Sequence, residues 1–291
     1  MSSEAGRMRQ LRQDGGFFLL PVRALIRVTG ADRLRYLNGQ LSNDLKRLAP
    51  DRAMRALALT AKGKLCAVVW VWLDGDAVIV ESDEVLGDAL LARLERYAVS
   101  DDVSFARVDP VPPLWHVFGP AAAGCAGLQI DRLGGDGRDT PVRPTGFLEA
   151  SESEREILRI ERGLPVWGRE LNEDTLPHEA GLDRAAVDFH KGCYVGQETV
   201  SRIESVGRVN RQLAGFLGDF DPSLAPNAKL LDASGAPAGY LTSAASCPGQ
   251  QKTAAMGYFH PRTGASSFSV VDESGACLGR AERSEFPLVS E

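Results

Sequence analysis

A segment rich in chemically competent side chains runs from residue 188 to 198 and reads DFHKGCYVGQE. It places the thiol of Cys193 two residues after Lys191 and between Gly192 and Gly196. Glycines permit a tight turn, and a thiol beside a cation at the start of a helix has a lowered pKa and a raised reactivity. The pattern predicts a tight loop that leads into a helix from about Glu198, with Cys193 and Lys191 as candidate catalytic residues.

Two interpretations of Cys193 are open from spacing alone. The thiol can be a small buried side chain whose neighbouring glycines only shape the turn, or it can act as a nucleophile or thiol-exchange group. A nucleophile would require a base, and His190 lies three residues earlier. Proximity along the chain does not show that the two side chains meet.

A carboxylate and an indole lie at the end of a second predicted helix, over 151–162. Ser151 begins this helix with the sequence pattern of a capping box. Glu161 could accept two hydrogen bonds from an amino-pyrimidine edge, and Trp167 could stack on a flat ring. In the alternative interpretation, Glu161 pairs with an arginine and Trp167 is part of the core.

Composition restricts the classes of partner. The net charge is −6, and no dense run of Lys and Arg indicates direct binding of nucleic acid. No apolar run approaches the roughly 18 residues of a membrane helix, so we expect no membrane partner and a cytoplasmic location. The five cysteines include no CxxC pair, and His116, His178 and His260 stand alone. Neither a disulfide framework nor a metal site is predicted.

The elements that must position these residues are mixed. A strand and a leucine-rich helix that Asp32 can cap are expected over 24–48, a hairpin with an Asp-Gly turn over 65–80, and a helix over 84–98. Hairpins without repeated strand-helix-strand crossovers favour an α+β fold. After about residue 205, short apolar runs alternate with turn residues, which predicts a small closed β domain.

The stretch RIERGLPVWGRELNEDTLPHEAGLDRAAVDFHKGCYVGQETVSR resembles the corresponding part of glycine-cleavage T-proteins, the aminomethyltransferases. The octapeptide KGCYVGQE, with Cys193 in place of the acidic residue usual in T-proteins, resembles the YgfZ-type folate-binding branch of that superfamily. The resemblance extends upstream through VTGADRLRYLNGQLSNDL and LTAKGKL and downstream through AGYLTSAASCPGQQKTAAMGYFHP. It therefore covers nearly the whole chain.

The resemblance implies a fold as well as a ligand. It implies two intertwined α+β subdomains with ferredoxin-like antiparallel sheets, followed by a small C-terminal β-barrel. The folate-binding region would span 1–205, as a composite of 1–50 with 114–205 and of 51–113, and the barrel would span 206–291. The implied ligand is tetrahydrofolate or a one-carbon derivative of it.

The resemblance also implies site residues. Glu161 would hold the pterin edge, Trp167 would wall the pocket, and Arg208 or Arg211 would meet the glutamate tail of the folate. The branch motif would comprise a set of seven residues. These are Lys191, Gly192, Cys193, Tyr194, Gly196, Gln197 and Glu198.

One departure from the T-protein pattern bears on activity. Cys66 and Ala67 stand where T-proteins carry an acidic pair, and neither can act as a carboxylate acid or base. Aminomethyl transfer by the usual mechanism is therefore not expected, and whether the chain is an enzyme stays open. The resemblance implies an accessory protein for assembly or repair of iron-sulfur proteins, which would indirectly support tRNA modification. The alternative is a folate-dependent one-carbon transferase or demethylase that uses another catalytic group.

Overall fold

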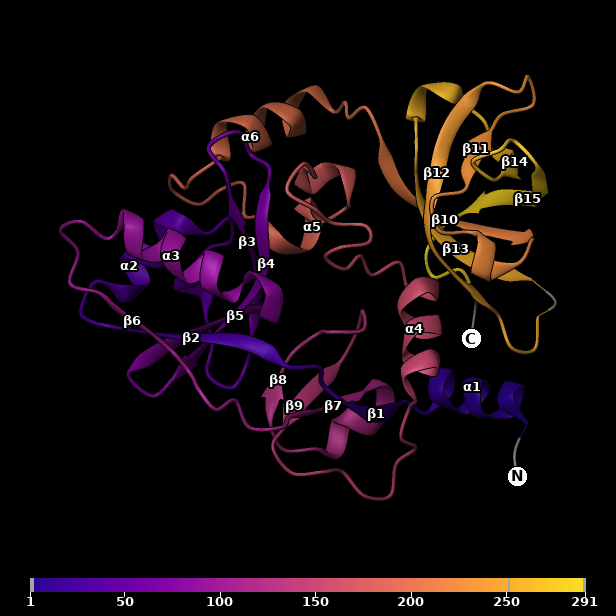
Figure 1. The fold of residues 1–291 in the computed structure, drawn as a ribbon. Helices are drawn as coiled ribbons and strands as arrows, with labels where there is room; N and C mark the ends of the chain where they lie inside the picture. Colours follow the sequence, from indigo (N-terminus) through magenta and orange to yellow (C-terminus); the bar gives the residue numbers. More distant parts are fainter. Residues whose placement is uncertain (1–2, 251, 290–291) are drawn as a thin grey trace.

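A computed structural model describes residues 3–250 and 252–289. It divides into a five-stranded sheet, a four-stranded sheet and a closed barrel, with the four-stranded sheet and helix α4 lying between the other two (Figure 1). Neighbouring strands are antiparallel throughout the three sheets, which confirms the predicted α+β class and the C-terminal barrel. Within the described residues, no helix combines the length and apolar character needed to cross a membrane.

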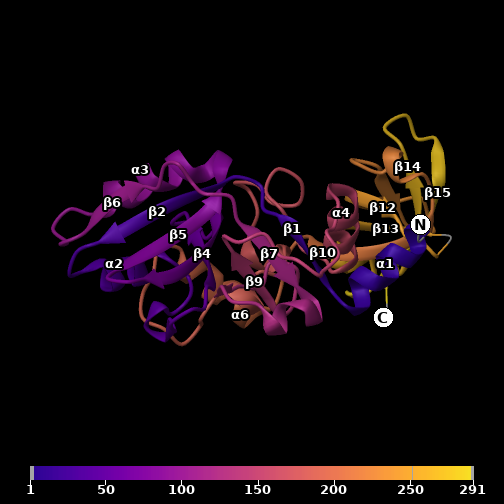
Figure 2. The same ribbon diagram turned by 90° about the horizontal axis from the view of Figure 1, so that it is seen from below.

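The five-stranded sheet packs with two helices around one apolar core. Its order is β3 (Met54–Leu59), β4 (Leu65–Asp74), β5 (Ala77–Asp83), β2 (Arg23–Thr29) and β6 (Ser104–Arg107). Helices α2 (Arg33–Gln40) and α3 (Gly87–Tyr97) lie beside this sheet (Figure 2). They contribute buried side chains to the same core as the strands. The predicted hairpin is confirmed, since β4 and β5 pair across the Asp-Gly turn.

Two predictions about the helix expected after Asp32, which is α2, are wrong. Asp32 makes no side-chain cap, because its carboxylate accepts from the Asp102 N–H and from Arg35 instead. The helix does not continue to residue 48, because Leu41 is extended and bridges to strand β3. Pairing with the sheet therefore outweighs the helical periodicity of the leucines.

The second sheet has the order β1 (Gly16–Leu19), β7 (Trp115–Phe118), β9 (Gly137–Thr140) and β8 (Leu128–Gln129). Helices α1 (Glu4–Gln13) and α4 (Glu152–Glu161) pack on it through a shared core. The capping box predicted at Ser151 is confirmed. Strand β2 belongs to the other sheet, so the expected division between 1–50 and 51–113 passes through one hydrogen-bonded sheet.

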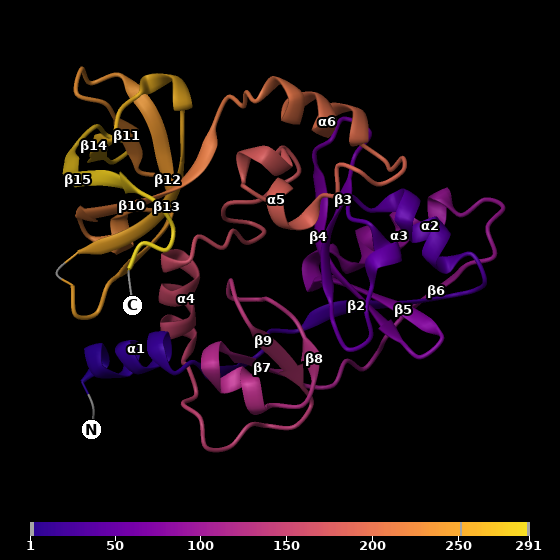
Figure 3. The same cartoon turned by 180° about the vertical axis from the view of Figure 1, so that it is seen from behind.

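The barrel strands lie between residues 212 and 284. Their order is β10 (Gln212–Asp219), β13 (Thr253–Phe259), β12 (Pro237–Ser246), β11 (Lys229–Leu231), β14 (Ser267–Val271) and β15 (Cys277–Ser284). Helices α5 (Asp183–Ala186) and α6 (Gln197–Val206) precede the barrel, and the chain crosses to it from the end of α6 (Figure 3). Short 3-10 helices complete the connections: η1 (Leu45–Arg47), η2 (Glu84–Leu86), η3 (Gly119–Gly124), η4 (Pro177–Glu179), η5 (Pro222–Leu224) and η6 (Pro261–Thr263).

A buried ionic network joins the two open sheets. Arg132 bonds to Glu81 on β5 at 2.7 Å and to Asp139 on β9, whose other oxygen lies 2.8 Å from Nδ1 of His116 on β7. Glu81 and His116 are completely inaccessible to solvent. Burial lowers the pKa of His116 from its ordinary value, against the opposing effect of Asp139.

We expect this histidine to make the protein sensitive to mild acid. The unfolded state binds the proton near pH 6.5 and the folded state resists it, so stability is lost as pH falls through 6.5. One such proton contributes at most about 1.4 kcal/mol per pH unit. Urea unfolding between pH 7.5 and 5.5 should show a shallower pH slope for His116→Gln than for wild type. An unchanged slope in His116→Gln, or an equal reduction in the exposed control His260→Gln, would contradict this origin.

Candidate functional site

A cavity of about 870 Å³ opens where three parts of the chain meet. Residues 43–55 with Trp70 form one wall, residues 129–137 form a second, and residues 184–190 form a third. The first segment leads into strand β3, the second lies around strands β8 and β9 of the four-stranded sheet, and the third comprises α5 and the loop after it. The volume lies within the range of pockets that hold small organic ligands.

Both arginines and aspartates line this cavity. Arg55 lies over the Trp70 ring, with its guanidinium carbon 4.6 Å from the ring centroid, and donates to the Asp131 carbonyl at 2.9 Å. Burial lowers the pKa of Arg55. No carboxylate pairs with it within 4.0 Å in the described parts of the chain, and Arg52 and Arg184 are exposed at the same cavity. A half-buried cation without a carboxylate partner favours an anionic ligand.

The segment that precedes Lys191 lines this cavity. Asp188, Phe189 and His190 line it, and the Asp188 carboxylate accepts the backbone N–H groups of His190 at 2.8 Å and Lys191 at 3.0 Å. These bonds, that of His190 first, lower the pKa of Asp188. The loop is therefore held in a defined turn at the cavity wall.

Lys191 anchors this loop to the end of α2. Its ammonium group donates to the carbonyls of Asn38, Leu41 and Asn43 at 2.7, 2.7 and 2.6 Å. An ammonium has three N–H donors, and all three are directed at these carbonyls. Burial lowers the pKa of Lys191 to about 8. The geometry therefore gives Lys191 a structural contact that its sequence position did not reveal.

The rest of the motif shapes the entry to α6. Cys193 and Gly192 are exposed, whereas the buried Tyr194 hydroxyl has no hydrogen-bond partner among the described residues. Gly196 has φ +89°, and a Cβ there would lie 2.6 Å from the Thr60 carbonyl oxygen, so only glycine fits. Gln197 and Glu198 form the first turn of α6, close to the predicted start.

The four residues expected to contact folate lie away from the 870 Å³ cavity. Both carboxylate oxygens of Glu161 accept hydrogen bonds from Arg12, at 2.6 and 2.9 Å. The side chain of Trp167 is half-buried and packs against one of the apolar cores. Arg211 pairs with Glu179 and lies over an aromatic ring, while Arg208 is exposed at a different cavity. The structure does not bring these four side chains together with the motif loop in one cavity.

The positions that depart from the T-protein pattern lie on strand β4. Ala67 is completely buried in the sheet core, and Cys66 is half-buried. Burial raises the pKa of the Cys66 thiol. Neither position supplies a carboxylate to a cavity.

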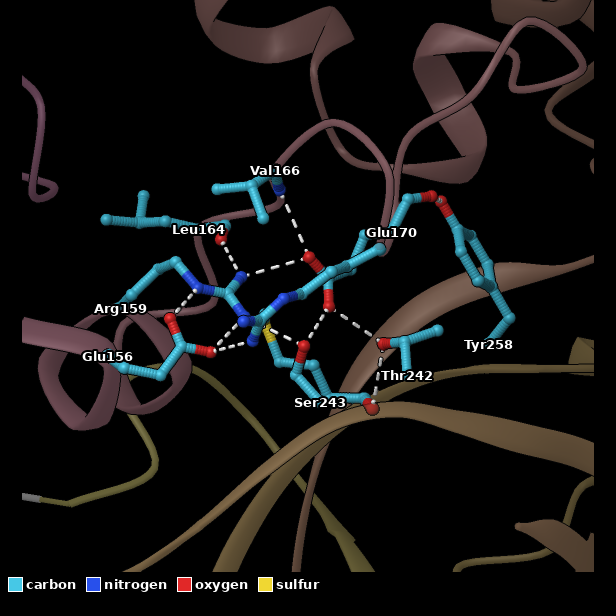
Figure 4. Close-up of polar contacts among 10 residues, drawn as sticks. Glu156, Arg159, Leu164, Val166, Glu170, Thr242, Ser243 and Tyr258 are labelled. Carbon is cyan, nitrogen blue, oxygen red and sulfur yellow. Dashed lines mark hydrogen bonds and ion pairs between the residues drawn. The ribbon is translucent and has the colours of Figure 1, made fainter. Parts of the chain in front are cut away.

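A buried polar network fixes the barrel to the rest of the protein (Figure 4). Arg159 of α4 pairs with Glu170 at 2.9 Å. The other Glu170 oxygen accepts from Ser243 at 2.6 Å and Thr242 at 2.9 Å, both on β12, and the Tyr258 hydroxyl of β13 donates to the Glu170 carbonyl. The single loop residue Glu170, through its carboxylate and its backbone carbonyl, thereby connects α4 with two barrel strands.

No sequence motif marks the cavity arginines or Trp70. Arg52 and Arg55 lie in a short loop and an edge strand without a recognisable motif, and Trp70 reads as an ordinary apolar strand residue. The spacing of Arg52 and Arg55, three residues apart, is the one sequence feature that could have indicated a positively charged site. Their convergence with Arg184 depends on the tertiary fold.

The comparisons with known proteins first define the class. No family model matches the chain. The fold is similar to the glycine cleavage system aminomethyltransferase T of Bartonella henselae, with a TM-score of 0.80, 17% identity, and coverage of 99% of this chain and 91% of that one. The chain therefore has the T-protein fold.

Sequence relatives narrow this class to a family. An uncharacterized protein of Haemophilus influenzae is 31% identical over 69% of this chain and 72% of its own length. The tRNA-modifying protein YgfZ of Yersinia enterocolitica is 27% identical over 67% of this chain and 68% of its own. An iron-sulfur cluster assembly factor IBA57 homolog, mitochondrial, of Phaeosphaeria nodorum is 29% identical over 73% of this chain, which spans 59% of that relative. The chain belongs to the YgfZ and IBA57 family, as its sequence motifs predicted.

Proposed function

We propose that this protein binds tetrahydrofolate, or a one-carbon derivative of it, and acts as an accessory factor in the assembly or repair of iron-sulfur proteins. Its partners would be assembly proteins or the proteins that receive clusters, and its support of tRNA modification would be indirect. The observation that carries the proposal is the 870 Å³ cavity with Arg55, which has no carboxylate partner among the residues that the structure describes. The names of the YgfZ and IBA57 relatives support the cluster and tRNA roles.

The cavity fits a folate in its chemistry. A folate carries glutamate carboxylates at one end and an amino-pyrimidine edge at the other. Arg52, Arg55 and Arg184 offer guanidinium groups, which suit carboxylates. Asp131 and Asp136 line the same cavity and offer carboxylate oxygens, which can accept from an amino-pyrimidine. We propose that the glutamate tail of the folate meets the arginines.

Anaerobic titration calorimetry with tetrahydrofolate tests this placement. Wild type should bind saturably, and Arg55→Met should raise the Kd by roughly ten- to a hundredfold, because a charge-assisted hydrogen bond is worth about 1.5–3 kcal/mol. The matched control is Arg262→Met, an exposed barrel arginine, which should leave the Kd unchanged. A Glu161→Gln variant tests the site implied by the resemblance.

The outcomes separate the possibilities. Absence of folate binding in wild type would overturn the proposed function. Weakening by Glu161→Gln but not by Arg55→Met would move the ligand to the site near α4. Turnover of methyl or aminomethyl donors by the folate-loaded protein would favour the transferase alternative over the accessory role.

A further inference from the structure

A second cavity, of about 490 Å³, contains a cluster of potential metal ligands. His178 comes from η4, Asp183 from α5 and Glu204 from α6. One ligand atom of each lies within 4.8 Å of the others. Three separate segments therefore bring one imidazole and two carboxylates close together in this cavity.

The histidine of this cluster is buried and only partly satisfied. Its side chain is 9% exposed, and Nε2 lies 3.3 Å from a Glu204 carboxylate oxygen. Nδ1 is buried and has no hydrogen-bond partner in the described part of the chain. A buried polar ring that is turned toward two carboxylates, with one nitrogen unused, is costly unless a ligand offsets it.

We propose that His178, Asp183 and Glu204 bind a divalent first-row transition-metal ion. Two carboxylates supply the negative charge that a dication needs, and the imidazole favours a transition ion over Mg²⁺ or Ca²⁺, which prefer oxygen ligands alone. Three protein ligands leave coordination positions open for water or an anion. Arg184 and Arg208 line the same cavity and suit such an anion.

The ion should be exchangeable. The Glu204 side chain is 52% exposed, and three protein ligands leave coordination positions open to water. We therefore expect Kd values on the order of micromolar rather than those of a closed structural zinc site.

Mn²⁺ is the appropriate probe, because the five thiols of the chain would compete for Zn²⁺. Chelator-treated full-length protein should bind one Mn²⁺ per chain in an electron paramagnetic resonance titration. Glu204→Gln, at a half-exposed side chain, should raise the Kd by about tenfold or more. Asp183→Asn should act in the same direction, and His178→Gln should do so if it folds.

Glu95→Gln is the matched control, since Glu95 is an exposed glutamate on another helix, α3. It removes the same charge and should leave Mn²⁺ binding unchanged. The proposal is overturned if wild type shows no saturable binding below millimolar Mn²⁺, or if Glu204→Gln and Glu95→Gln bind alike. Displacement of Mn²⁺ by an equal concentration of Mg²⁺ would overturn the choice of a transition ion. Folate binding is measured separately, so the two proposals can fail independently.

Discussion

Replacing Glu170 by alanine should lower the free energy of unfolding by about 2–4 kcal/mol, because Arg159 then keeps only Glu156 as a carboxylate partner and the buried hydrogen bonds to Glu170 are lost. Arg159 is 8% exposed and Glu170 is completely buried in the pair. The change also removes the acceptor of the Thr242 and Ser243 hydroxyls of the barrel. Urea unfolding followed by circular dichroism measures the loss.

Two comparison variants make this result interpretable. Glu173→Ala changes an exposed glutamate three residues away and should alter stability by less than about 0.5 kcal/mol. The double variant Arg159→Met with Glu170→Leu should be destabilised by less than the sum of the single changes, because each single change already removes the ion pair between these two side chains. An effect of Glu170→Ala below about 1 kcal/mol would show that solvent reaches the pair.

Replacing Lys191 by methionine should lower the free energy of unfolding by about 2–4 kcal/mol, since three carbonyls at the end of α2 lose their donor. The loop that carries Cys193 should then loosen. Alkylation of Cys193 should stay as fast as in wild type or become faster, and proteolysis within the loop should increase. Lys62→Met, at an exposed lysine, is the control and should change neither property.

This prediction distinguishes two roles for Lys191. If the ammonium activates the thiol, as the spacing of the two residues allows, Lys191→Met should slow alkylation of Cys193 while stability is nearly unchanged. Mass spectrometry of all five thiols under a pulse of alkylating reagent gives the rates. Slower alkylation without loss of stability would contradict the anchoring role.

The sequence alone determined the fold class, and the physical reason is local. Strand alternation around the Asp-Gly turn, the capping box at Ser151 and the short strands after residue 205 each depend on neighbouring residues. These local patterns agree with the structure. The extent of helix α2 did not follow from them, because its end at Gln40 depends on pairing of the next residues with β3.

The sequence also indicated which chemistry single residues can perform, but it did not indicate which residues they contact. The motif KGCYVGQE identified the family, yet the contact of Lys191 with residues about 150 positions earlier in the chain exists only in the folded protein. The same is true of the ion pair between Glu161 and Arg12, 149 positions apart. Loop closure across such separations leaves no periodicity in the sequence. Residue types therefore set which chemistry this protein can carry, and the tertiary structure decided which side chains meet to carry it.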